Sequence, residues 1–128
     1  MNRIYEKLRL NEYFRDKLRI DASKKCLTIS FNEYLHLHYL EGSYESARDE
    51  GLIFLNNHLT HWHITDDEEA LEIITEFAND DIVCIEDTSV FSLCRLRIVE
   101  RERFEKKKYM SKKSLRIYTG NEIIMYSD

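Results

Sequence analysis

The chain has 128 residues, of which 43% are hydrophobic and 34% are charged, and its formal net charge is −5 at pH 7. This length suits one domain of typical size, and the apolar content is too high for a disordered protein. Nine charged residues in the first twenty positions exclude a signal-peptide core, and the longest clean apolar run, 52–55, is far too short for a membrane span. We therefore expect a cytoplasmic protein.

The three cysteines, Cys26, Cys84 and Cys94, are odd in number and form no C-x-x-C pair. The sequence therefore predicts neither a disulfide framework nor a zinc ribbon, and reduced thiols fit a cytosolic protein. Cys84 and Cys94 lie inside apolar runs, which favours buried, inert thiols over nucleophiles.

The chain begins with a helical pattern. Apolar residues of the segment 2–19 fall in one arc of a helical wheel, interrupted by Lys7 and Arg15, which predicts a first amphipathic helix. Residues 26–29 are typical of a short strand.

Two further helices are predicted before residue 60. Ser30 and Glu33 have the spacing of a capping box, which predicts a second helix that ends at Gly42. Ser43 is a suitable cap for a third helix up to about residue 59, whose apolar residues predict extensive burial.

A fourth helix over 66–78 has the clearest pattern. Thr65 and Glu68 match a second capping box. Six apolar residues behind it share one arc of the helical wheel: Ala70, Leu71, Ile73, Ile74, Phe77 and Ala78.

From residue 82 the pattern changes to that of strands. The segment 82–86 is typical of a buried strand, and an extended structure suits 89–99 better than a helix. Gly120 and Asn121 predict the turn of a hairpin between 115–118 and 122–126. Together these patterns predict an α+β fold in which N-terminal helices pack on a C-terminal antiparallel sheet, within a single globular domain over residues 1–128.

Three histidines lie within HLTHWHITDDEE, residues 58–69. His58, His61 and His63, with Asp66 or Asp67, have the chemistry of ligands for zinc or another divalent ion. In an extended segment His61 and His63 project to the same side. A metal-binding hydrolase that uses His61 and His63 is therefore one alternative function.

A structural interpretation accounts for the same residues more simply. His58 lies on the apolar arc of the predicted third helix, and Trp62 and Ile64 would point into the core. Asp66 and Asp67 occupy the first turn of the next helix, where the helix dipole favours acids. We therefore assign no metal ligand, cofactor or catalytic residue, and no sequence motif of a known catalytic class is present.

Charge is strongly segregated along the chain. Residues 1–48 hold nine Lys and Arg against seven Asp and Glu; residues 49–94 hold none against twelve, and 95–128 hold ten against five. The modest net charge therefore hides an acidic middle and a basic end.

The acidic middle provides the leading functional hypothesis. Acids recur along the fourth helix and just beyond it, and like charges at this spacing cost a few tenths of a kcal/mol per pair, about 0.2–0.5. An acidic face of this kind steers and binds a basic partner by complementary potential. We expect a small protein-interaction module that inhibits a basic protein, such as a nuclease toxin, as an inhibitor, antitoxin or immunity protein does. The predicted partner-binding residues are Glu68, Glu69, Glu72, Glu76, Asp80 and Asp81.

The segment from Arg101 to Arg116 provides a second alternative. Its eight basic residues surround Phe104 and Tyr109, a composition that permits phosphate contact and base stacking. Glu102 and Glu105 within the segment, Glu100 just before it, and a pI near 5.6 weigh against a dedicated nucleic-acid-binding protein. A self-neutralising segment that folds against the acidic helix is the favoured interpretation, and 101–113 is compatible with either helix or strand.

Overall fold

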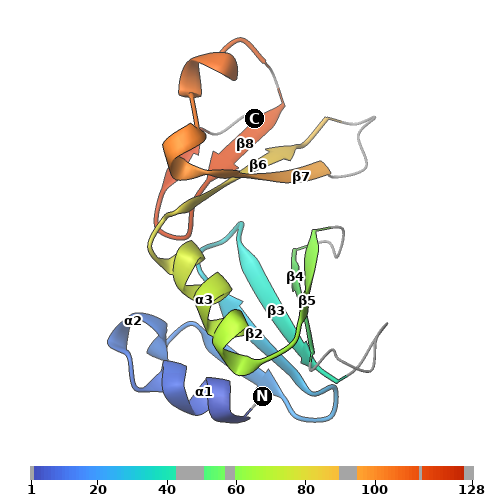
Figure 1. Cartoon of the computed structure of the whole chain (residues 1–128). Helices are drawn as coiled ribbons and strands as arrows, with labels where there is room; N and C mark the ends of the chain where they lie inside the picture. The colour runs from blue at the N-terminus through green and yellow to red at the C-terminus, as the bar shows by residue number, and fades with distance from the viewer. Residues whose placement is uncertain (1, 43–50, 57–59, 90–94, 113, 126–128) are drawn as a thin grey trace. The chain divides into compact units, whose positions relative to one another are not determined.

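The computed structural model describes residues 2–42, 51–56, 60–89, 95–112 and 114–125. They form an α+β fold with three α-helices and two antiparallel sheets, of five and four strands (Figure 1). The chain divides into two compact units, Met1–Ile74 and Thr75–Asp128. The α+β class is confirmed, but the arrangement of N-terminal helices on a C-terminal sheet is wrong, because the first unit contains a sheet of its own. The single domain over 1–128 stays a prediction.

The first unit is a five-stranded meander with helices before and after it. Its strands follow one another in space as they do in the chain, in the order β1-β2-β3-β4-β5. The elements are α1 (Asn2–Arg9), α2 (Glu12–Arg15), β1 (Leu18–Asp21), β2 (Cys26–Ser30), β3 (His36–Glu41), β4 (Gly51–Leu55), β5 (His61–Ile64) and the beginning of α3 (Asp67–Ala78). The boundary between the units falls inside α3.

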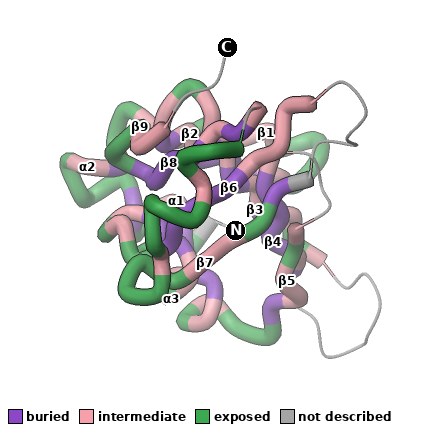
Figure 2. The backbone as a smooth tube through the Cα atoms, turned by 90° about the horizontal axis from the view of Figure 1, so that it is seen from above, coloured by how far each residue is buried: buried purple, intermediate pink, exposed green. Residues whose placement is uncertain are grey.

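One face of this sheet forms the core of the first unit. Leu27, Tyr39 and Ile53 lie opposite one another on β2, β3 and β4, and each is at most 1% exposed. The helices contribute buried residues to the same unit, and α1 and α2 flank one face of the sheet (Figure 1). These are Ile4, Leu8, Phe14, Ala70 and Ile74. Buried positions thus concentrate in the strands and recur three or four residues apart along α1 and α3; Figure 2 colours each described residue by its burial.

The predicted helix over 2–19 is two short helices followed by a strand. The Asn11 side chain accepts a hydrogen bond from the backbone N–H of Tyr13 at 2.8 Å, and so caps α2. An Asn at this position ends the first helical run because its side chain competes for backbone donors. The chain then becomes extended at Leu18, where the unpredicted strand β1 begins. The strand predicted over 26–29 is confirmed as β2.

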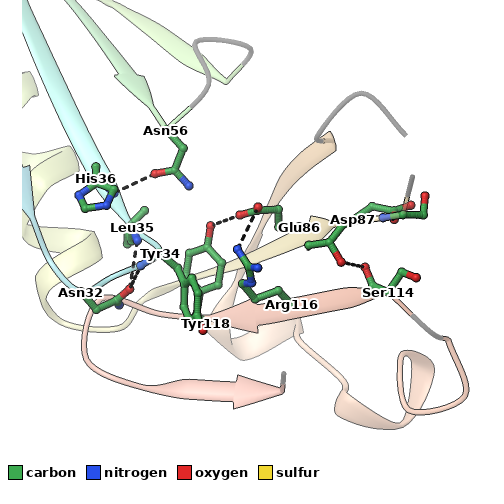
Figure 3. Close-up of polar contacts among 12 residues, drawn as sticks. Asn32, Tyr34, Leu35, His36, Asn56, Glu86, Asp87, Ser114, Arg116 and Tyr118 are labelled. Atoms are coloured by element: carbon green, nitrogen blue, oxygen red, sulfur yellow. Dashed lines mark hydrogen bonds and ion pairs between the residues drawn. The ribbon is translucent and has the colours of Figure 1, made fainter. Parts of the chain in front are cut away.

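The predicted second helix is wrong, because 36–41 is strand β3. Asn32 replaces the predicted cap: its Oδ1 accepts hydrogen bonds from the backbone N–H groups of Tyr34, at 2.8 Å, and Leu35, at 3.0 Å (Figure 3). The turn that these hydrogen bonds form joins β2 to β3. Asn is common in turns because its side chain can bond to the backbone a few residues further on. The sequence of β3 then alternates, with Leu37 and Tyr39 buried and their neighbours half-buried.

The predicted third helix is also wrong over the residues that the structure describes. Gly51–Leu55 is strand β4, which pairs with both β3 and β5. A short, continuous apolar run cannot be assigned to helix or strand by its periodicity, because burial on both faces suits either structure. Ser43 and His58, which the helix prediction also used, lie outside the described residues.

The predicted fourth helix is confirmed as α3, Asp67–Ala78. Its cap is Asp66 rather than Thr65: Asp66 Oδ1 accepts a hydrogen bond from the N–H of Glu69 at 2.8 Å. Thr65 instead donates its hydroxyl hydrogen bond to the Glu69 carboxylate, also at 2.8 Å. Two adjacent capping residues therefore fix the beginning of the helix.

The second unit contains the end of α3 and a four-stranded antiparallel sheet. Its strand order is β7-β6-β8-β9. The elements are β6 (Ile82–Asp87), β7 (Arg95–Glu100), the 3-10 turns η1 (Arg101–Arg103) and η2 (Lys106–Lys108), β8 (Leu115–Tyr118) and β9 (Ile123–Met125). The predicted strand at 82–86 and the predicted C-terminal hairpin are confirmed. The described part of 101–113 is neither the helix nor the strand that the sequence permitted.

A small apolar cluster holds this sheet together. Val83, Ile85, Leu115 and Ile117 are buried, and partly buried apolar residues pack against them, among them Phe104. The 3-10 turns are therefore tied to the sheet through their aromatic side chains. No helix within the described residues is long and apolar enough to cross a membrane.

Gly51, the first residue of β4, is tightly enclosed. A Cβ atom placed on Gly51 would lie 2.6 Å from the Tyr39 ring and 2.8 Å from the carbonyl oxygen of Leu40. We expect Gly51→Ala to lower the free energy of unfolding by about 1–3 kcal/mol through overpacking. Urea denaturation measures this, with Leu10→Ala as control because Leu10 is 76% exposed. Equal stability of the two variants would contradict this packing.

Candidate functional site

The acids of α3 differ in exposure. Glu68 and Glu72 are exposed and form no ion pair within the described part of the chain. Glu69 is half-buried and holds the hydroxyl of Thr65. The last turn of α3 carries no basic residue, so nothing on the helix itself offsets these charges.

Asp80 has a structural role in the second unit. Its Oδ1 accepts hydrogen bonds from Asn121, from the backbone N–H at 3.1 Å and from the side-chain amide at 2.9 Å. The same amide donates to the carbonyl of Ala78 at 2.7 Å. Asp80 has a φ of 62°, a conformation that Asp tolerates better than most residues. It therefore anchors the β8–β9 turn to the end of α3.

Two other predicted residues, Glu76 and Asp81, line an acidic cleft of about 480 Å³ within the second unit. Glu100 and Glu102 lie on the same cleft, together with Ile82 and Arg101. Four carboxylates thus share the cleft with one guanidinium. Asp81 and Glu102 are exposed, and neither side chain is paired within the described residues.

Backbone hydrogen bonds fix the geometry of this cleft. The N–H of Asp81 donates to the carbonyl of Glu76 at 2.9 Å, and the N–H of Arg101 donates to the carbonyl of Asp81 at 2.8 Å. Glu100 lies opposite Ile82 in the β6–β7 pair. The Arg101 guanidinium interacts with the Glu122 carboxylate, 3.4 Å away, so part of its charge is already offset. Glu100 is likewise offset in part, because its carboxylate lies 3.5 Å from the Arg103 guanidinium. Asp81 and Glu102 keep the cleft acidic overall.

Sequence reasoning missed Glu100 and Glu102 because both lie at the edge of the basic segment. The signal that could have found them is the pairing of β6 with β7. An antiparallel partner for 82–86 within 95–100 places Glu100 beside the beginning of β6. Such a pairing is long-range, and a single sequence does not specify it.

Not every acid after α3 is available to a partner. The Glu86 carboxylate accepts a hydrogen bond from the Tyr118 hydroxyl at 2.7 Å, and Arg116 lies 3.4 Å from its other oxygen (Figure 3). Glu86 is only 16% exposed at its side chain. It is a structural acid, held in place across β6 and β8 by two neighbouring donors.

The two aromatic residues of the basic segment are partly buried. Phe104 and Tyr109 stack on each other, with ring centroids 5.7 Å apart, and both pack against the core of the second unit. Lys112 lies over the Tyr109 ring at 5.9 Å. Part of each ring is therefore covered, and nucleic-acid binding by this segment stays a prediction.

The histidines of β5 project to one side, as predicted for an extended segment. His61 and His63 have ring centroids 5.3 Å apart in an edge-to-face arrangement. Ile64 is buried, as predicted, and Trp62 is half-buried. Within the described residues, no group of three His, Cys, Asp or Glu side chains is placed to hold a metal ion. His58 lies outside the described residues.

No protein-family model, curated protein or solved structure matches the chain. The chemistry of its own residues therefore carries any functional argument.

The neighbouring acids Asp80 and Asp81 have different roles, which substitution can separate: Asp80 anchors the β8–β9 turn, and Asp81 lines the cleft. We expect Asp80→Ala to lower the free energy of unfolding by about 0.5–1.5 kcal/mol, because the hydrogen bonds to Asn121 are lost while water can still reach the exposed donors. Asp81→Ala should change stability by no more than about 0.5 kcal/mol, because its side chain is exposed. Thermal and urea unfolding measure both. An equally large loss in the two variants would contradict a structural role specific to Asp80.

Cys84 gives a second test. Its side chain is fully buried, and burial together with the nearby Glu86 raises the pKa of its thiol to about 12. At pH 8 only about one part in ten thousand is then thiolate, the reactive form. In a Cys94→Ser background, we expect a thiol reagent to modify half-buried Cys26 about a hundredfold faster than Cys84. Urea should abolish the difference; comparable rates in the folded protein would contradict the burial of Cys84.

Proposed function

We propose that the protein is an interaction module that binds and inhibits a basic protein partner, in the manner of an inhibitor, antitoxin or immunity protein. The observation that carries this proposal is the acidic cleft of the second unit. Its four carboxylates, from Glu76, Asp81, Glu100 and Glu102, line a space of about 480 Å³. A cleft lined by one sign of charge concentrates its field and attracts groups of the opposite sign.

The chemistry of the cleft favours a cationic side chain as its occupant. A guanidinium presents several N–H donors in one plane and pairs with carboxylates by two parallel hydrogen bonds. Asp81 and Glu102 are exposed and unpaired within the described residues, so they keep their acceptor capacity for a partner. Glu68 and Glu72 on α3 are further exposed carboxylates, and they belong to the first unit.

Inhibition would follow from occlusion. A nuclease binds the phosphate backbone through a cationic groove. An acidic protein that occupies this groove blocks access of the substrate and needs no catalytic group of its own. This mechanism agrees with the electrostatic features of the cleft and assigns no chemistry to the histidines.

The decisive experiment compares two variants of equal charge. The cleft variant is Asp81→Asn with Glu102→Gln; the matched control is Glu12→Gln with Glu33→Gln, which removes two exposed acids elsewhere. Each tagged protein is used for affinity capture from the native organism at low and at moderate salt. Captured proteins are identified by mass spectrometry, purified, and measured for association rate and inhibition.

We expect wild type and control to retain a basic protein that the cleft variant loses, with association slowed roughly tenfold at low salt and less at high salt. The same partner should lose its own activity on binding. Equal retention by the cleft variant, or capture of nucleic acid alone, would overturn the proposal. Loss of binding in a Glu68→Gln, Glu72→Gln variant alone would move the contact from the cleft to α3.

A further inference from the structure

The face of the first sheet that is turned away from the core contains a cavity. Residues paired directly across antiparallel strands share a face. By this register Arg19, Thr28, His38 and Phe54 form one row across β1 to β4, on the face opposite to the buried row of Leu27. A cavity of about 610 Å³ lies along this row. This volume is in the range of pockets that bind small molecules, about 300–1,000 Å³.

The charged residues of this cavity leave it with an excess of positive charge. Two cations, Arg19 and Lys24, line it together with one acid, Asp21. The Asp21 carboxylate accepts hydrogen bonds from the Ser23 hydroxyl at 2.6 Å and from the N–H of Lys24 at 3.3 Å. These hydrogen bonds hold the Asp21 carboxylate against the turn that follows β1. The Arg19 side chain is exposed and forms no ion pair or hydrogen bond within the described residues.

The remaining lining combines polar and apolar groups. Thr28 Oγ1 and His38 Nδ1 are 2.9 Å apart and share a hydrogen bond. The His38 ring stacks on Phe54, with centroids 4.9 Å apart and planes inclined by 26°. Together, the bond and the stacking fix the orientation of the imidazole. Leu40 adds an apolar surface to the same cavity, and the Thr28 hydroxyl keeps further hydrogen-bonding capacity.

We propose that this cavity binds a small aromatic anion. A carboxylate or phosphate group would lie against Arg19 and Lys24, because a guanidinium matches the geometry of both. The aromatic body would pack on Leu40 beside the His38–Phe54 pair. This site lies entirely within the first unit, and it is independent of the acidic cleft of the second unit.

Two simple probes test the proposal: phenyl phosphate and benzoate, each titrated into the millimolar range, where ligands of this size bind. Binding is followed by chemical shifts of backbone amides in ¹⁵N-labelled full-length protein. Inorganic phosphate and benzyl alcohol serve as controls that carry only the charge or only the ring. We expect saturable shifts at Arg19, Thr28, His38 and Leu40 with at least one aromatic anion. The anion that saturates identifies the preferred head group.

The matched variants are Arg19→Gln and Lys7→Gln, which each remove one exposed cation. Arg19→Gln should weaken binding at least tenfold, whereas Lys7→Gln should leave it unchanged. Both variants should keep the amide spectrum of the folded protein, because neither side chain is buried. The absence of saturable shifts with both anions, equal binding by the two variants, or equal binding of inorganic phosphate and phenyl phosphate would overturn the proposal.

Discussion

The register of β2, β3 and β4 is the constraint on which the first unit depends. Side chains alternate between the faces of a strand, so a slip of one residue would exchange the buried and the outer rows. The correct register buries Tyr39 and turns His38 outward. Two local features hold it: the turn at Asn32, which sets the β2–β3 connection, and Gly51, whose missing side chain leaves room for the Tyr39 ring. The cavity on the outer face exists because of the same register.

In the second unit, strand pairing decides which acids keep their charge available. β6 is central, with β7 on one side and β8 on the other. Pairing with β8 places Arg116 opposite Glu86, where the two charges meet across neighbouring strands. Asp81 precedes β6, and the residue beside it, Arg101, directs its guanidinium to Glu122 instead. One acidic stretch of sequence therefore supplies the acid of a half-buried ion pair at one end and part of an open cleft at the other.

The sequence predicted the elements whose signals are local. Helix α3 has both a cap and a long apolar arc, and Gly120 with Asn121 marks a turn between two short strands. Strands β3 and β4 were missed because the local sequence patterns around them also fit a helix. The spacing of Ser30 and Glu33 fits a capping box, yet the hydrogen bonds of Asn32 decide the backbone. The residues of the cleft show the same difference. Glu76 and Asp81 belong to an acidic run and were predicted, whereas Glu100 lies beside them only because β7 pairs with β6.

The ion pairs explain why the basic end of the chain does not cancel its acidic middle. Arg101, Arg103 and Lys108 pair with Glu122, Glu100 and Glu105. Glu105 lies within the basic segment, Glu100 directly precedes it, and Glu122 directly precedes β9. These pairs are exposed, and each contributes little to stability, about 0–1 kcal/mol. Their effect is on the distribution of charge, because they offset three cations locally. Asp67 at the beginning of α3 is paired with Arg3, whereas Glu68, Glu72 and Asp81 form no ion pair within the described residues. Each of these three acids therefore keeps a negative field that acts beyond contact distance, over roughly a Debye length of 8 Å at physiological salt. That field is the physical basis for expecting a cationic partner.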